Sequence, residues 1–316
     1  MTAVFLTIDT ELAWRHHQAG HDREEVYRRS IEPAGVGLKF QLARLAEHRL
    51  KACFFVDPMS ALTYGLDHVR RMVDPILSAG QEVQLHLHPN WAAARPGDRG
   101  EVRVRFELCD YSQGEQRGLI EGAAELLIAA GAPAPLAFRA GSYAADDSTL
   151  QALAELGFAY DSSHNGAHHP WPSRIGLEPG RTAPTARGVI EVPVTVIEDA
   201  PGSLRNVQIC ALSSGELRGT LEHAAANGHA AVTIVSHSFE LANREGTRAN
   251  AIHVQRFLGL CAALDEMRDA LPTARFADRP QLTLDGDDAP LAPNMLRRRW
   301  RQAEQLWSNW VLERAA

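Results

Sequence analysis

The sequence predicts a parallel α/β protein in which a closed or nearly closed ring of strands is surrounded by helices. Three observations predict this fold class. Short apolar runs alternate along the chain with longer helical patterns, which is typical of repeated βα units. The runs are apolar almost throughout, as in strands that are buried on both faces. No run is followed by a glycine-rich dinucleotide or phosphate loop, so a (β/α) barrel is favoured over an open nucleotide-binding sheet.

The first half of the chain predicts three strands and three helices. The strands are expected at 3–8, 52–56 and 82–88, and the helices at 34–49, 67–78 and 114–130. Leu38, Leu42 and Leu45 give the first helix its apolar stripe, and Gly80 and Gly131 end the other two. A polar stretch that is rich in arginine and glycine predicts a loop over residues 92–111.

The second half of the chain continues the alternation. The strands are expected at 136–139, 158–161, 189–197 and 231–235, and the helices at 147–156, 215–227 and 248–270. Asp146 or Asp147 caps the first of these helices, Gly228 ends the second, and a further pair of elements precedes residue 215. Residues 162–188 are rich in glycine, proline and histidine, and a loop of this length predicts a functional segment.

The last part of the chain is expected to be separate from the barrel. We divide the chain into a barrel over 1–283 and a linker plus amphipathic helix over 284–316. Apolar residues recur at helical spacing over 295–313, a segment that holds three of the six tryptophans. This pattern predicts a helix packed on its own barrel or on a second subunit of an oligomer. Arginines beside tryptophans also suit peripheral contact with an anionic membrane surface.

Composition limits the classes of function. Of the 316 residues, 45% are hydrophobic and 22% are charged, which is ordinary for a globular protein and excludes a disordered chain or a rod. The net charge of −7 excludes a whole-surface basic footprint, so no nucleic-acid partner is expected. Because Asp9 follows the first apolar residues so closely, no signal peptide is expected and the protein is expected to be cytoplasmic. The four cysteines contain no Cys-x-x-Cys pair and are expected to be reduced.

Acidic and histidine pairs follow two of the predicted strands. Asp9 and Glu11 share a face if their strand continues, because side chains two apart point the same way. Two carboxylates on one face are costly unless they bind a metal or titrate apart. His86 and His88 share a face in the same manner, and two such imidazoles can converge on one zinc ion. A capping aspartate, a surface glutamate and ordinary core histidines are the simpler alternatives.

Arg139 and His237 close two further strands. The arginine can pair with a carboxylate, and the histidine can act as an acid or base near neutral pH. In parallel βα architectures these strand ends gather on one face. Trp14, Trp91 and Trp171 fall beside them, where aromatic faces would suit stacking on a sugar ring, although ordinary partial burial also explains each one.

The order of these segments resembles the polysaccharide deacetylase family, the NodB-homology carbohydrate esterases of family 4. The resemblance spans about residues 3–280. It implies a distorted (β/α) barrel that removes N- or O-acetyl groups from sugars, usually with zinc. The family's first motif, Thr-Phe-Asp-Asp-Gly, is similar to Thr-Ile-Asp-Thr-Glu here. It implies Asp9 as the base and, because Thr10 replaces the family's metal aspartate, Glu11 as the ligand, although these two roles could be exchanged.

The remaining motifs imply the other roles. The second motif has histidines four apart; His86 matches the first, but Asn90 stands at the second, so His88 is the expected ligand. The third motif, Arg-x-Pro-Tyr, is similar to the segment from Arg139 to Tyr143 with one extra residue. It implies that Arg139 holds the base carboxylate and that Tyr143 lies in the sugar groove.

The last two motifs complete the resemblance. Residues 157–163 are similar to the fourth motif, and Val235-Ser236-His237 looks like the fifth, Leu-x-His, which implies His237 as the general acid. The resemblance therefore implies a hydrolase that uses zinc, or another divalent ion, to remove an acetyl or similar acyl group from a sugar. We expect a nucleotide- or lipid-linked precursor of a surface polysaccharide as substrate. A metal-free hydrolase of cyclic amides or ureides, and a degenerate barrel that only binds sugar, are the alternatives.

Overall fold

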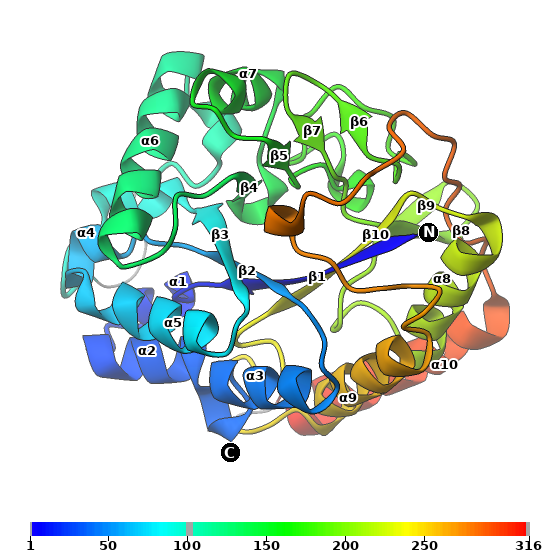
Figure 1. Ribbon diagram of the computed structural model, residues 1–316. Helices are drawn as coiled ribbons and strands as arrows, with labels where there is room; N and C mark the ends of the chain where they lie inside the picture. The colour runs from blue at the N-terminus through cyan, green and yellow to red at the C-terminus, as the bar shows by residue number, and fades with distance from the viewer. Residues whose placement is uncertain (1, 99–103, 314–316) are drawn as a thin grey trace.

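One curled sheet of eight strands forms the centre of the molecule in the computed structural model, which describes residues 2–98 and 104–313 (Figure 1). The strand order is β10-β1-β2-β3-β4-β5-β7-β6, and only β6 and β7 pair antiparallel. The strands span Ala3–Thr10 (β1), Cys53–Val56 (β2), Glu82–Leu87 (β3), Ala137–Ala140 (β4), Tyr160–Asp161 (β5), Thr185–Ala186 (β6), Ile190–Glu191 (β7) and Ala231–His237 (β10).

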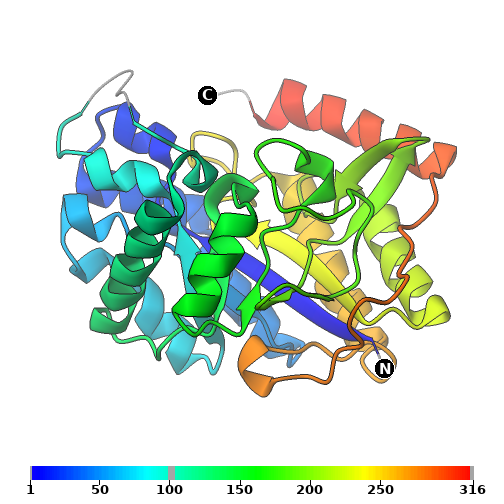
Figure 2. The same cartoon turned by 90° about the horizontal axis from the view of Figure 1, so that it is seen from above.

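Helices surround the outer face of this sheet (Figures 1 and 2). They span Trp14–Gln18 (α1), Arg23–Ile31 (α2), Leu38–Glu47 (α3), Ala61–Tyr64 (α4), Asp67–Ser78 (α5), Gln113–Ala129 (α6), Asp147–Glu155 (α7), Ser214–Asn227 (α8), Ala251–Glu266 (α9) and Met295–Trp307 (α10). None of the helices in the described segments is long and apolar enough to cross a bilayer. Part of the predicted loop over 92–111, residues 99–103, lies outside the described residues.

The alternation of side chains along β1 explains how the sheet positions the site. Val4, Leu6 and Ile8 are buried in the main core, which lies between the sheet and the helices. Phe5 points to the other face, where its ring stacks on that of Phe276 at 4.5 Å inside the barrel. Since side chains two apart share a face, the interior row that contains Phe5 continues through the next odd-numbered positions to the carboxyl end of the strand.

The prediction of one strand over 189–197 is wrong, because the two ends of this segment belong to different sheets. Only Ile190–Glu191 pairs in the main sheet, whereas Val196–Ala200 (β8) forms a hairpin with Ser203–Asn206 (β9). Pro193 lies between them and has no N–H to donate to a ladder. The chain then crosses to the far edge of the sheet, where Thr195 donates from its N–H to the carbonyl of Thr233 in β10. Irregular backbone therefore spans the gap between the two edges of the curled sheet.

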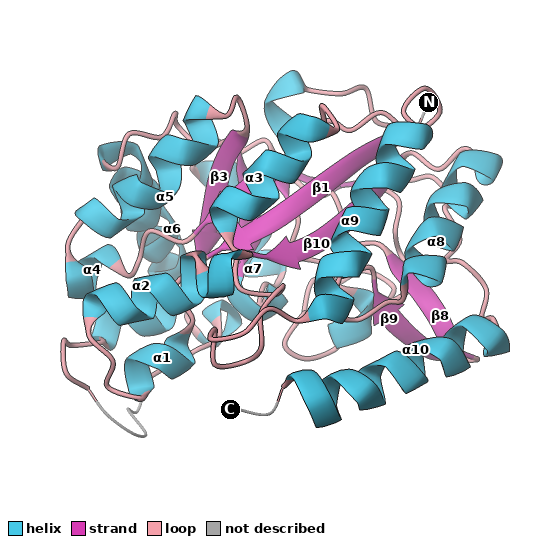
Figure 3. Cartoon of the chain, turned by 90° about the horizontal axis from the view of Figure 1, so that it is seen from below, coloured by secondary structure: helices cyan, strands magenta, loops and turns pink. Residues whose placement is uncertain are grey.

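The C-terminal helix α10 lies across α8 and the β8–β9 hairpin (Figure 3). It turns its polar side to the body: Arg301 is 4% exposed and pairs with Asp199 of β8 and Glu216 of α8. The opposite side is apolar and exposed. We call it the tryptophan face, and it consists of Met295, Leu296, Trp300, Leu306, Trp307, Trp310 and Val311.

Candidate active site

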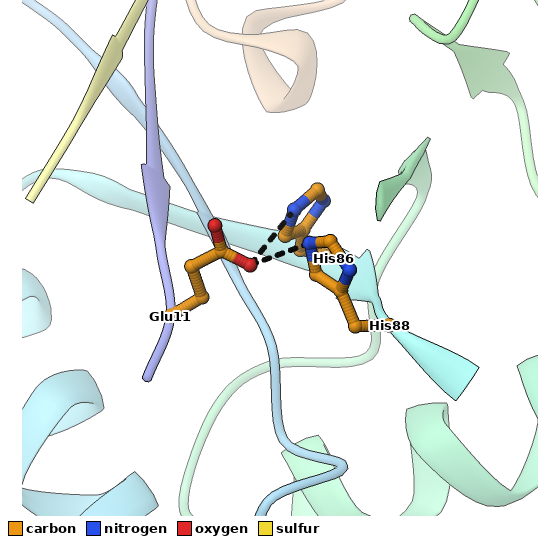
Figure 4. A group of neighbouring side chains, drawn as sticks. All are labelled: Glu11, His86 and His88. Atoms are coloured by element: carbon orange, nitrogen blue, oxygen red, sulfur yellow. Dashed lines mark ion pairs between the residues drawn. The ribbon is translucent and has the colours of Figure 1, made fainter. Parts of the chain in front are cut away.

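Three predicted residues meet at the carboxyl ends of β1 and β3 (Figure 4). The Glu11 carboxylate oxygen Oε2 lies 2.5 Å from Nε2 of His88 and 3.7 Å from Nε2 of His86. One ligand atom from each residue lies within 4.8 Å of the other two. Glu11 and His86 are buried, and the His88 side chain is 18% exposed, so the group has one open side. We call these three residues the metal triad.

The orientation of His86 is fixed by its other ring nitrogen. His86 stands opposite Arg139 in the parallel pairing of β3 with β4, and its Nδ1 lies 2.8 Å from the Arg139 carbonyl oxygen. A carbonyl only accepts, so Nδ1 carries the hydrogen and donates it. That leaves the lone pair on Nε2, the nitrogen that faces Glu11. A backbone partner of this kind is typical of histidines that bind metals.

The charges of the triad are strongly coupled. Burial would raise the pKa of Glu11, but His88, His86 and His237 together outweigh burial and hold that pKa far below its usual range. Burial would likewise lower the pKa of His88, but the Glu11 carboxylate raises it to about 9. Burial lowers the pKa of His86 to about 4, so this ring is neutral near pH 7.

The donor set of the triad fits a zinc ion. Two imidazole nitrogens and one carboxylate oxygen are the ligands of many catalytic zinc sites, which keep a further position open. Here that combination lies on one buried patch, with His86 already neutral and correctly oriented. Thr10, which lies between Asp9 and Glu11, donates from its hydroxyl to the Ile8 carbonyl oxygen at 3.3 Å. Glu11 is therefore the carboxylate that meets both histidines.

Asp9 lies in a different arrangement from Glu11. Its Oδ1 accepts a hydrogen bond from Nη1 of Arg139 at 2.7 Å, and the Arg139 side chain is 0% exposed. The guanidinium also donates to the hydroxyls of Thr7 and Ser162 and lies over the ring of Phe55, 4.4 Å from its centroid. Such a fully engaged guanidinium cannot move, so it holds the Asp9 carboxylate in one place.

His237 completes the group at the end of β10. The register of the β1–β10 pair sets it opposite Asp9, and its Nε2 lies 3.9 Å from Oδ2 of that carboxylate. On the other side, Nδ1 lies 3.9 Å from Glu240 and 3.3 Å from the side-chain nitrogen of Gln208. Burial would lower the pKa of His237, but Glu240 and then Asp9 raise it to about 9. The imidazole is therefore protonated at neutral pH.

Three residues of this site were missed from the sequence: Asp57, Gln208 and Glu240. Asp57 directly follows β2, so the same strand-end argument that singled out Asp9 would have found it. It is buried; Oδ1 accepts from the Met59 N–H, and burial raises the pKa of its carboxyl to about 7. Gln208 and Glu240 gave no comparable signal, because they come from irregular segments beside β10.

The aromatic residues that were predicted to contact sugar fall in different places. Trp14 and Trp91 form an edge-to-face pair with centroids 5.0 Å apart beside the triad, and Trp91 is 1% exposed beneath its neighbour. Tyr143 is buried close to Asp9, with Val194 and Val235, and its hydroxyl has no partner within the described residues. Trp171 is half exposed on the long loop.

A pocket of about 290 Å³ opens onto the metal triad. Glu11 and His88 line it together with Trp14, Trp91 and Asn90, while Tyr143 and Trp171 do not. The Asn90 side chain is buried, and its amide oxygen has no hydrogen-bond partner within the described ranges. The pocket thus combines the donor atoms of the triad with an aromatic wall.

Comparisons with known proteins show the fold. The sequence matches no profile of a known protein family, and no curated protein sequence matches it. The structure is similar to that of a protein from Mycobacterium smegmatis assigned to the polysaccharide deacetylases, with a TM-score of 0.56 and 17% identity over 90% of this chain and 95% of that one. The chain therefore has the polysaccharide deacetylase fold, a (β/α) barrel that is distorted as predicted.

Two further solved structures are similar at lower scores. A family 4 carbohydrate esterase from Streptomyces lividans, in complex with acetate, has a TM-score of 0.43 and 14% identity over 93% of this chain and 98% of that one. The polysaccharide deacetylase Bc1974 from Bacillus cereus has a TM-score of 0.42 and 13% identity over 91% of this chain and 99% of that one.

Proposed function

We propose that this chain, which has the polysaccharide deacetylase fold, is a zinc-dependent hydrolase that removes an N-acetyl or similar acyl group from a sugar. The observation that carries the proposal is the position of two groups at one end of the sheet. The metal triad offers three ligands of the type that zinc prefers. Beside it, Asp9 and His237 face each other across 3.9 Å, as a carboxylate and an imidazole that can move protons.

The side chains of this group have separate roles in the proposal. When bound, zinc supplies a Lewis acid that polarises the acyl carbonyl. Asp9, fixed by Arg139, accepts a proton from the attacking water. His237, whose raised pKa of about 9 keeps it protonated near neutral pH, donates a proton to the leaving nitrogen. Trp14 presents an aromatic edge of the pocket to the sugar ring.

The substrate and its setting form the finer part of the proposal. We propose an activated sugar precursor of a surface polysaccharide, linked to a nucleotide or a lipid, and action in the cytoplasm, where such precursors are assembled. The exposed tryptophan face of α10 supports contact of the protein with a lipid surface or a second subunit, because large apolar patches on a protein surface mark such contacts.

Metal analysis tests the proposal directly. Protein purified without chelator should hold about one zinc per chain, and His86→Ala and His88→Ala should each lose it, because two ligands cannot hold a catalytic zinc tightly. His68→Ala is the matched control, since His68 is also a buried histidine but belongs to α5 and bonds Ser60. The zinc-loaded parent should release acetate from N-acetylated sugars.

Two results would contradict the proposal. Zinc that remains in both triad variants would exclude these histidines as ligands. A parent protein that takes up no divalent ion, even when zinc is supplied, would leave a metal-free hydrolase or a sugar-binding barrel as the explanation of the fold.

A further inference from the structure

Two arginines line the pocket beside the metal triad. Arg15 of α1 and Arg244 of the segment after β10 lie 229 residues apart in the sequence, and both contribute to the wall that contains Glu11 and His88. Nε of Arg15 donates to the backbone carbonyl of Arg244 at 2.7 Å, so the two residues are locked together. Neither position was singled out from the sequence.

The position of Arg15 is connected to the reacting end of the pocket through Phe239. The Arg15 guanidinium carbon lies over the Phe239 ring, 4.9 Å from its centroid. That same ring stacks on the His237 imidazole, with centroids 5.1 Å apart. Phe239 also lines the pocket. The guanidinium is therefore held at a fixed place one aromatic ring away from the residue proposed to protonate the leaving group.

Within residues 2–98 and 104–313, neither of the two guanidinium groups has a carboxylate partner. None of the ion pairs formed within the described residues includes Arg15 or Arg244, although the chain as a whole carries a net charge of −7. Burial and then the positive charge of Arg244 lower the pKa of Arg15. Among the described residues of the pocket wall, Glu11 supplies the only carboxylate, and it lies close to two imidazoles.

The two acidic residues outside the pocket that raise the pKa of Arg15, Glu245 and Glu313, also have other partners. Glu245 lies 3.8 Å from Arg29, and the Glu313 carboxylate accepts from the Arg244 backbone N–H and from Asn250, both at 2.8 Å. Each of these two acids has a smaller effect on the pKa of Arg15 than Arg244 has. Two like charges that line one pocket, neither paired with an acid of the described segments, form a ready site for an anion.

We propose that Arg15 and Arg244 form a subsite for a phosphate or carboxylate group on the acylated substrate. The inference rests on the proposed function, since it concerns the substrate of the same pocket. The substrate class that it names is an acylated sugar that carries an anionic group close to the acyl group. Guanidinium groups bind the oxygens of phosphate and carboxylate through paired N–H donors, and two of them balance a dianion such as a phosphate monoester. Neutral acylated sugars lack that contact.

Binding of three probes to the zinc-loaded protein tests the inference. The probes are N-acetylglucosamine, its 1-phosphate, and N-acetylmuramic acid. All three carry the acetyl group; the first is neutral, the second adds a phosphate and the third adds a carboxylate. Calorimetry should give about tenfold or tighter binding for at least one anionic probe over the neutral one, as expected for charge-assisted hydrogen bonds. The tighter of the two anionic probes identifies the anionic group.

Variants assign this preference to the two arginines. Arg15→Gln and Arg244→Gln should each remove most of the preference for the anionic probe while zinc content stays at the parental level. Arg15→Lys, which keeps the positive charge, should retain part of the preference for the anionic probe. Arg299→Gln is the control, because Arg299 is an exposed arginine of α10 outside the pocket and should leave the preference unchanged.

The results separate this inference from the proposed function. Equal affinity for all three probes, or a preference that survives in both glutamine variants, would overturn the anion subsite even if acetate is released. Arginine-dependent binding of the anionic probe without release of acetate would uphold the subsite and count against the hydrolase.

Discussion

At the scale of single residues, the two carboxylates on the interior face of β1 have different partners. Asp9 meets the buried guanidinium of Arg139, whereas Glu11, just past the end of the strand, meets two imidazoles. The sequence could show that both side chains share a face, but it left their roles exchangeable. The side chains that distinguish them come from β3 and its carboxyl end and from β4, more than 70 residues away along the chain.

Replacement of His237 by alanine should lower kcat without loss of zinc. The imidazole is protonated near neutral pH and faces Asp9, so its removal takes away a proton donor and no ligand of the triad. A general acid contributes about 10²–10⁴-fold to a rate, and we expect a fall in this range. Steady-state kinetics and metal analysis on the same preparation measure both quantities. Loss of zinc from this variant would show that His237 belongs to the metal site.

A second carboxylate pair predicts a pH dependence of stability. Asp161 and Glu191 stand opposite each other in β5 and β7 and are both fully buried. Burial and then the Asp161 carboxylate raise the pKa of Glu191 well above its usual value. The folded state therefore keeps a proton that the unfolded chain releases above about pH 4.5. Because the folded state binds more protons, its stability falls as pH rises through this window.

Glu191→Gln should abolish that part of the fall. Glutamine keeps an oxygen for the His164 N–H, which now donates to Glu191 at 2.9 Å, and it carries no ionisable group. The free energy of unfolding of the variant, relative to the parent, should rise between pH 5 and pH 8 by up to about 1.4 kcal/mol per pH unit. Denaturant titrations at each pH measure the difference. For Glu125→Gln, at an exposed position of α6, the free energy of unfolding should change with pH as it does in the parent. The same pH dependence in Glu191→Gln would show that Glu191 is not the source of the fall in stability.

At the scale of elements, apolar patterns predicted most of the parallel strands and the helices that connect them. They did not predict α2, because only one side of this helix is apolar and most of its residues are charged. Its signal was local: Asp22 accepts from the Glu25 N–H, and an aspartate followed by a glutamate three residues later is typical of a helix start. The β8–β9 hairpin also had only a local signal. It turns at Pro201-Gly202, a typical turn sequence, but its strands are too short to show an alternation of apolar and polar residues.

Arg301 is buried where α10 docks on β8 and α8, beside a second ion pair between Glu304 of α10 and Arg256 of α9. Arg301→Met would leave Asp199 and Glu216 as buried carboxylates without this partner, and breaking a buried ion pair in this way costs about 3–5 kcal/mol. We expect α10 to detach, with earlier proteolysis of the linker over 284–294 and a lower Tm. Arg299→Met changes an exposed arginine of the same helix and should alter neither quantity. Identical proteolysis of the two variants would show that Arg301 does not hold the helix.

At the scale of the whole molecule, curling of the sheet brings the separate strand ends to one pocket. The sequence predicted that the candidate catalytic and metal-binding residues follow strands, and a parallel barrel gathers the carboxyl ends of its strands on one face. It could not predict the pocket wall, because Arg15 and Arg244 meet only through the closure of β1 on β10. Most of the helices that connect the parallel strands could be predicted, but the side that α10 presents to the body could not. Arg301 faces inward whereas Trp300 and Trp307 face outward, the reverse of an ordinary amphipathic surface helix.

The tryptophan face of α10 predicts peripheral binding to lipid that depends little on lipid charge. Trp300 and Trp307 are 66% and 61% exposed and lie seven positions apart, on one side of the helix. Two of the arginines that favoured an anionic surface, Arg298 and Arg301, pair with Asp199, whereas Arg299 stays exposed. Partition should therefore come from apolar contact, with only a small gain from anionic lipid.

Co-sedimentation with vesicles measures this binding. The parent should sediment with phosphatidylcholine vesicles and only slightly more with added phosphatidylserine, whereas Leu306→Gln combined with Trp307→Gln should stay in solution, because it removes two exposed apolar side chains from the contact. Gln302→Ala, at an exposed polar position of the same helix, is the matched control and should bind as the parent does. If the parent does not sediment but forms a dimer that the double variant dissociates, the tryptophan face is a subunit interface, and the membrane prediction is wrong.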